Sequence, residues 1–280
     1  MTEKKPKAYP AASLPLSIAA VSSYLDTTVL GSTMAVVNTI DSTNKYIKKN
    51  ISVLDDGFTI VAEKQFSGRG RLGRTFESPE GGLYMSILLI GRELIENVDS
   101  VTVRAAVAVK NAIKELTGLE NVGIKWVNDI YCEDKKICGI LAERIVRKGY
   151  CDFSVLGIGV NVTTPKKAFE GELSEIAGSI SDFTKVDFSR NELCAAILNH
   201  LEKTLFVTDK DESTRILDDY RDSSVIIGRD VYISNGEKTV RAKVLGIDDL
   251  ASLYVQYEDG LTEILRTGEV STKLIKGEDK

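Results

Sequence analysis

A run of glycines and arginines at residues 67–74, Ser-Gly-Arg-Gly-Arg-Leu-Gly-Arg, has the clearest chemical character in the sequence. Its glycines allow the backbone to fold closely around a ligand and to adopt positive φ angles. Arg69, Arg71 and Arg74 carry planar guanidinium groups suited to phosphate or carboxylate oxygens. The run lies between two segments with the pattern of core strands, where a long loop is usually functional. We therefore predict a loop that binds an anionic ligand.

Two other interpretations of this run are weaker. A solvated Gly-Arg tract would not be expected between two core strands, and an RNA-binding tract would carry aromatic residues between the arginines to stack on bases. The run also lacks the G-x-x-x-x-G-K-[ST] pattern of a P-loop.

A second group of polar residues lies around a predicted hairpin. Lys125-Trp126-Val127-Asn128-Asp129 precedes it, and Lys136 lies where the hairpin re-enters the sheet, close to Gly139. The ammonium of Lys136 could therefore project into a cleft. By residue type alone, a hairpin lysine is exposed to solvent, Trp126 is a core residue, and Asn128-Asp129 forms a turn.

Two shorter motifs could also belong to a site. Asp41-Ser42-Thr43-Asn44 is rich in residues that begin helices, so that a helix cap is its simplest interpretation. Gly157 and Gly159 lie inside a strand pattern ending near Asn161, which indicates the close approach of a ligand or of another stretch of backbone.

Hydrophobic patterns predict the elements that must position these motifs. The expected strands are 34–40, 58–62, 83–90, 122–126, 130–132, 137–145 and 153–162, and the expected helices are 44–50, 101–116, 187–207 and 212–220. Short turns between the later strands imply antiparallel pairing. After residue 222, short strands separated by turn dipeptides (231–233, 239–247, 253–257 and 262–265) predict a small SH3-like β-barrel.

We therefore expect an α+β fold with a mixed, largely antiparallel sheet. Its expected units are a leader segment over 1–33, in which a mobile stretch is followed by one short helix at 16–24, a catalytic domain over 34–222, and a β domain over 223–280.

Composition narrows the classes of function. The chain has 280 residues and a net charge of −5, which argues against a general nucleic-acid binder. Its apolar runs are too short for a membrane span. Four cysteines without a C-x-x-C pair indicate reduced thiols and a cytoplasmic protein.

The single histidine, His200, excludes mechanisms that need two imidazoles. It lies on the apolar side of a predicted helix and is expected to be a half-buried structural residue.

In order and spacing, these motifs resemble those of the bacterial-type biotin–protein ligase family. The family patterns D-S-T-N, Q-x-x-G-R-G-R-x-G-R, K-W-P-N-D, K-x-x-G-I and G-x-G-x-N appear in sequence between Asp41 and Asn161. The resemblance covers about residues 34–276 and implies a catalytic domain like that of class II synthetases, followed by an SH3-like domain. Residues 1–33 are too short for a three-helix DNA-reading head, so that we expect no N-terminal DNA-binding domain.

The resemblance implies an ATP-dependent, AMP-forming biotin–[acetyl-CoA-carboxylase] ligase. Such an enzyme joins biotin to ATP with Mg²⁺, releases pyrophosphate, and passes biotin to a lysine of a biotin carboxyl carrier domain. Arg71 and Lys136 are the implied catalytic residues, and Asp129 would contact the acceptor lysine. The implied biotin-binding residues are Ser42, Thr43, Asn44, Gln65, Arg69, Gly70, Arg71 and Lys136. The implied nucleotide-binding residues are Arg69, Arg71, Arg74, Phe76, Asn128 and Asn161. No residue is assigned to a metal.

Three positions depart from the family pattern. Val127 replaces the usual proline, Leu72 replaces a residue that is often arginine, and Phe76 stands where a tryptophan often lies near the nucleotide. None of the three removes a residue with an implied catalytic role.

Other functions remain open at this stage. The same superfold includes lipoate and octanoate ligases, although the Gly-Arg run and the K-W-x-N-D block resemble biotin ligases more closely. A biotin-sensing transcriptional repressor and a non-enzymatic SH3-like adaptor are further alternatives; the adaptor leaves Arg71 and Lys136 unexplained. We expect no nucleic-acid or membrane partner, and a homodimer is compatible with the sequence. We also expect the Gly-Arg run and residues 163–178 to cover the site.

Overall fold

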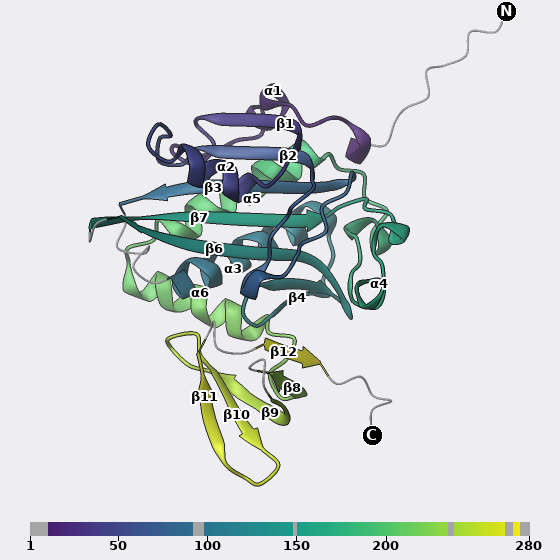
Figure 1. Cartoon of the computed structure of the whole chain (residues 1–280), viewed down its shortest axis with the longest axis vertical. Helices are drawn as coiled ribbons and strands as arrows, with labels where there is room; N and C mark the ends of the chain where they lie inside the picture. Colours follow the sequence, from purple (N-terminus) through teal and green to yellow (C-terminus); the bar gives the residue numbers. More distant parts are fainter. Residues whose placement is uncertain (1–10, 92–97, 148–149, 235–237, 267–270, 275–280) are drawn as a thin grey trace, which may run out of the picture.

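The computed structural model describes residues 11–91, 98–147, 150–234, 238–266 and 271–274, which form two sheets and the helices around them (Figure 1). The larger sheet has seven strands in the order β1-β2-β3-β7-β6-β5-β4. β1 and β2 are parallel and the other neighbours are antiparallel, which confirms the mixed, largely antiparallel sheet. Its strands are β1 (Met34–Ile40), β2 (Thr59–Gln65), β3 (Gly82–Ile90), β4 (Val122–Lys125), β5 (Asp129–Cys132), β6 (Lys135–Arg147) and β7 (Tyr150–Asn161).

Helices cover the two faces of this sheet unequally (Figure 1). On one face lie the long helices α3 (Val98–Thr117), α5 (Arg190–Leu205) and α6 (Lys210–Asp222), and on the other lies α2 (Thr43–Asn50). Local signals set their ends: α3 is followed by Gly118 with φ +67°, and α5 begins with a capping box between Ser189 and Glu192. The remaining short helices are α1 (Ile18–Ser22), α4 (Glu172–Ile176) and single 3₁₀ turns.

Strand β3 shows how the two faces divide the core. Met85, Ile87 and Leu89 pack into the large cluster under the long helices, whereas Leu88 packs with Ile47 of α2. Successive strand residues point to opposite faces. Ser86 therefore lies on the α2 face, which is the face that forms the site.

The smaller sheet confirms the prediction that a second, small set of antiparallel strands follows the main sheet. Its antiparallel strands run in the order β11-β10-β9-β8-β12, and the last of them was not predicted. They are β8 (Asp230–Ser234), β9 (Thr239–Ile247), β10 (Leu253–Tyr257), β11 (Thr262–Leu265) and β12 (Ser271–Leu274). Trp126, a core residue as predicted, joins the sheets because its indole Nε1 donates to the carbonyl of Ala251 at 2.8 Å.

Residues 11–33 correct the prediction of a mobile leader. Leu16, Val21 and Leu30 are buried in the main core. The Arg190 guanidinium donates to the carbonyls of Ala12 and Leu14, at 3.1 and 3.0 Å, and also pairs with Glu63. These side chains, which are distant in sequence, hold the segment against α5 and β2. The first ten residues lie outside the described part of the chain.

Two smaller expectations can also be compared with the structure. His200 is partly buried, and its Nε2 lies 2.7 Å from an oxygen of Glu115, which confirms a structural histidine. Among the described helices, none is long and apolar enough to cross a membrane.

Candidate active site

A cavity of about 780 Å³ lies on the α2 face of the large sheet. This volume is within the range of about 300–1,000 Å³ that is typical of small-molecule sites. Its walls come from the start of α2, the Gly-Arg run, the middle of β6 and β7, α4, and strands β8 and β9 of the small sheet. The cavity therefore brings together the four motifs that the sequence separates, and most of the predicted site residues line it: Ser42, Thr43, Asn44, Gln65, Arg69, Gly70, Arg71, Arg74, Phe76, Asn128, Asp129 and Lys136.

The Gly-Arg run (residues 67–74) folds as a tight turn over the cavity. The N–H of Gly70 donates to the carbonyl of Arg74 at 2.8 Å. Gly73 has φ +73°, and a Cβ at Gly68 would lie 2.3 Å from the carbonyl oxygen of Phe76. Gly73 therefore has the predicted positive φ, and Gly68 has the predicted close approach of backbone. Leu72 also has a positive φ of 55°, which is costly for a residue with a side chain.

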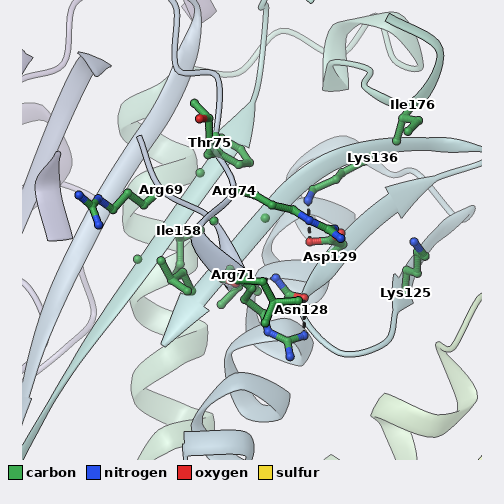
Figure 2. A pocket seen from close by; sticks show the side chains of 18 of the residues that line it. Arg69, Arg71, Arg74, Thr75, Lys125, Asn128, Asp129, Lys136, Ile158 and Ile176 are labelled. Atoms are coloured by element: carbon green, nitrogen blue, oxygen red, sulfur yellow. Dashed lines mark hydrogen bonds and ion pairs between the residues drawn. The ribbon is translucent and has the colours of Figure 1, made fainter. Parts of the chain in front are cut away.

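Cationic side chains gather at one end of the cavity (Figure 2). The Lys136 ammonium lies 2.7 Å from a carboxylate oxygen of Asp129, and the Arg74 side chain extends toward this pair. The Arg71 guanidinium donates to the side-chain oxygen of Asn128 at 3.3 Å. Arg69 points the other way, away from Lys136 (Figure 2). Three of the four predicted cations thus surround one end of the cavity.

Lys125 is a lining residue to which the sequence analysis gave no role. Its ammonium lies 5.7 Å from the ring centroid of Tyr131. Burial lowers the pKa of Lys125, and the positive charges of Lys136 and Arg74 lower it further, while Asp129 opposes the shift. The K-W-x-N-D block was the signal that could have found it.

Phe76 occupies the space left by two strand glycines. A Cβ at Gly159 would lie 2.5 Å from the Phe76 ring, and one at Gly139 would lie 2.8 Å from it. Lys136 lies 5.8 Å from the centroid of the same ring, within the range of a cation–π contact. A close approach of a ligand or of backbone was predicted at Gly157 and Gly159, and side chains make it instead: Asn44 at Gly157 and Phe76 at Gly159. The Phe76 ring thereby places an aromatic face beside the cations.

Uncharged polar groups form the other end of the cavity. The backbone N–H and the hydroxyl of Thr43 donate to the side-chain oxygen of Gln65, at 2.8 and 3.0 Å. The side-chain nitrogen of Gln65, Nε2, donates to the hydroxyl of Ser78 at 3.0 Å. Ser42 caps the N-terminus of α2, and its hydroxyl accepts a long 3.5 Å hydrogen bond from the N–H of Lys45. The D-S-T-N motif is thus both a helix cap and a wall of the cavity.

Asn161 is placed differently from its predicted role. Its side chain is buried outside the cavity lining, and its Nδ2 donates to the carbonyl of Gly178 at 3.0 Å. It therefore anchors the segment 163–178, whose α4 residues Leu173 and Ile176 line the cavity opposite the Gly-Arg run.

Comparisons with known proteins agree with this geometry. A family model described as the biotin/lipoate A/B protein ligase family matches residues 36–161, which span the motifs up to Asn161. The bifunctional ligase/repressor BirA of Bacillus subtilis is 31% identical over 244 residues, covering 86% of this chain and 74% of that protein. The biotin–[acetyl-CoA-carboxylase] ligase of Mycobacterium tuberculosis is 29% identical over 222 residues, covering 77% of this chain and 79% of that protein.

A solved structure extends the similarity to the fold. The biotin protein ligase from Aquifex aeolicus, in complex with biotin and ATP, matches with a TM-score of 0.75 and 27% sequence identity. The match covers 87% of this chain and 100% of that one, and so includes both sheets.

Proposed function

Because the chain belongs to the biotin/lipoate A/B protein ligase family and is a biotin–protein ligase, we propose how its own residues divide the reaction. Biotin occupies the uncharged polar end of the cavity, between Ser42, Thr43, Asn44 and Gln65. ATP occupies the cationic end, with its base beside Phe76. The carboxylate of biotin and the α-phosphate of ATP then meet near Arg71 and Lys136.

This proposal rests on one observation: one end of the cavity is polar and uncharged, and the other end is cationic. A neutral ring system with several polar groups needs hydrogen-bonding partners when it is buried, and the end near α2 supplies them. Two anionic reactants need positive charge between them, and Lys136, Arg71 and Arg74 supply it at the other end.

In the first step, an oxygen of the biotin carboxylate attacks the α-phosphorus of ATP. A P–O bond forms, the bond to the β-phosphate breaks, and pyrophosphate leaves with the electron pair, which gives biotinyl-5′-AMP. Arg71 and Lys136 offset the repulsion of the two anions and stabilise charge on the pentavalent transition state. The reaction depends on the positioning of the two substrates and on the neutralisation of their charge. It needs no histidine as an acid or base, and the single histidine lies in α5.

In the second step, a neutral lysine amine of the carrier domain attacks the carbonyl carbon of the mixed anhydride. A C–N bond forms, the C–O bond to the phosphate breaks, AMP leaves with the electron pair, and the nitrogen loses one proton to solvent. Asp129 lines the cavity and accepts a hydrogen bond from the incoming amine. In the structure, the Asp129 carboxylate pairs with Lys136 at 2.7 Å. The same carboxylate therefore holds Lys136 in the first step and contacts the acceptor amine in the second. The partner is the carrier domain of a biotin-dependent carboxylase, and we place the reaction in the cytoplasm.

Mg²⁺ is expected to enter with ATP. This ion is usually held by substrate phosphates with only one or two carboxylates. Among the described residues, no group of three or more His, Cys, Asp or Glu side chains is arranged to hold a metal.

The mixed anhydride must be kept from water. The Gly-Arg run and α4, which belongs to the segment 163–178, both line the cavity, and we propose that both segments tighten when the substrates bind. Limited proteolysis tests this: biotin plus ATP should protect cleavage sites at Arg69, Arg71 and Lys166. Equal cleavage with and without substrates would contradict it.

The decisive assay supplies ATP, Mg²⁺ and labelled biotin, with and without a biotin carboxyl carrier domain. We expect pyrophosphate release without the carrier and label on the carrier when it is present. The same assay with lipoate or octanoate tests the alternative within the superfold, and turnover of these acids in preference to biotin would overturn the assignment. The domain limits, 34–222 and 223–280, remain part of the proposal.

A further inference from the structure

Two residues behind the cavity wall, Ser86 of β3 and Glu143 of β6, contact the biotin end without lining it. We propose that they are positioning residues that fix the direction of the hydrogen bonds there, so that the hydroxyl oxygen of Thr43 faces the ligand as an acceptor. This inference rests on the proposed function and adds the requirement that the ligand donate an N–H at this point.

The argument begins with a chain of four oxygens. The Gln65 side-chain oxygen lies 3.0 Å from the Thr43 hydroxyl, which lies 2.6 Å from the Ser86 hydroxyl. The Ser86 hydroxyl in turn lies 2.5 Å from the side-chain oxygen of Asn44. Each hydroxyl has one hydrogen to donate. Three oxygen–oxygen contacts must therefore share two hydrogens.

Both ends of this chain are held as acceptors. The Gln65 oxygen also accepts the backbone N–H of Thr43 at 2.8 Å, and its amide nitrogen donates to Ser78. The Asn44 amide nitrogen donates to a carboxylate oxygen of Glu143 at 2.8 Å. Because an ionised carboxylate only accepts, Glu143 prevents the Asn44 amide from turning its nitrogen toward Ser86.

The structure directs both hydroxyl hydrogens along this chain of oxygens. The Thr43 hydroxyl donates to the Gln65 oxygen at 3.0 Å. The Ser86 hydroxyl donates toward the Asn44 and Thr43 oxygens, at 2.5 and 2.6 Å. The Thr43 hydroxyl therefore has no hydrogen left for a ligand, and the remaining lone pair of its oxygen can only accept. The fused urea of biotin carries N–H donors that match it.

Glu143 is itself held in place, which makes the arrangement specific. Lys48 pairs with its other oxygen, and a Cβ at Gly157 would lie 2.2 Å from the Asn44 oxygen, so that the amide is packed directly against the strand. Exchange of the carboxylate for an amide would let Asn44 turn over, and the direction of every hydroxyl in the chain could then reverse.

The test compares Glu143→Gln and Ser86→Ala with the wild-type enzyme. We expect each variant to raise the KM for biotin about tenfold, the cost of one hydrogen bond to a buried ligand, and to leave the KM for ATP within about twofold. An analogue of biotin methylated at the ureido nitrogens provides a second measurement. Wild-type enzyme should discriminate strongly against it, and both variants should discriminate less.

Glu202→Gln is the matched control. It makes the same chemical change at a carboxylate that binds the backbone of residues 28–30 on the other face of the sheet, so that stability falls while both KM values stay at the wild-type level. An unchanged KM for biotin in both variants, with an active wild-type enzyme, would overturn the inference. An equal rise in the two KM values would overturn it as well, because it would indicate a general loss of structure. Failure of the wild-type enzyme to use biotin would instead refute the proposed function.

Discussion

Replacement of Lys136 by methionine tests the cationic end of the cavity most directly. The change removes an ammonium while keeping a side chain of similar length beside Phe76 and Gly139. Loss of one preorganised donor to a developing negative charge typically lowers kcat about 10²–10³-fold, or roughly 3–4 kcal/mol of transition-state stabilisation. We expect adenylate formation to slow by this amount while the protein remains folded.

The partner of Lys136 makes the prediction quantitative. At 2.7 Å from Asp129 and an effective dielectric constant of about 20, Coulomb's law gives roughly 6 kcal/mol of attraction, most of which the desolvation of both groups offsets. Without Lys136, the Asp129 carboxylate would face the anionic substrates without the cation that now lies 2.7 Å from it. Lys136→Met/Asp129→Asn should therefore form adenylate faster than Lys136→Met, with a coupling energy of about 1–3 kcal/mol.

The assay is pyrophosphate release in a single turnover without carrier domain, followed by transfer from preformed biotinyl-5′-AMP. Asp129→Asn alone should slow the transfer step more than adenylate formation. Lys203→Met is the control, because it removes an exposed lysine from α5, away from the cavity. Wild-type adenylate formation by Lys136→Met, or strict additivity in the double variant, would refute the reasoning.

Three further changes probe other parts of the structure. Arg71→Ala should lower adenylate formation at least a hundredfold with an unchanged far-ultraviolet spectrum; a normal rate would remove Arg71 from the site. Gly157→Ala places a methyl group 2.2 Å from the Asn44 oxygen, so that isothermal titration should show biotin binding weakened more than tenfold, against a negligible effect of Gly246→Ala, which has open space. Burial raises the pKa of Glu202, but hydrogen bonds from residues 28–30 outweigh it and lower the net pKa below 4.5. Its stabilisation is therefore complete above about pH 5 and is lost as the pH falls through the lower, folded pKa, so that the melting temperatures of wild type and Glu202→Gln should converge in acid.

The elements that depend on local patterns were predictable from the sequence. Strand β9 matches its predicted bounds, 239–247, because apolar and polar residues alternate along it. The helix before residue 118 was found by its periodicity and its terminal glycine. The final strand, β12, was not predicted, because its sequence Ser-Thr-Lys-Leu has one apolar residue and so no alternation of apolar and polar positions.

Long-range contacts account for what the sequence could not reveal. The segment 11–33 has no strong pattern of its own, and it is held by Arg190 and Glu202, which are more than 170 residues away. The side chain of Asn161 follows the predicted glycine motif, yet its direction depends on the carbonyl of Gly178. Ser86 and Glu143 are ordinary strand residues in sequence, and their relation to Asn44 exists only after three separate segments have come together.

The hydrogen bond between Trp126 and Ala251 gives this protein an internal optical reporter. Trp126 is the only tryptophan in the chain, it lines the cavity, and its indole nitrogen contacts the small sheet. Excitation at the red edge of the protein absorption band would therefore excite Trp126 alone, and its fluorescence would report on the contact between the two sheets. Any substrate that draws the sheets together or apart should shift the emission maximum, without a dye or an engineered label.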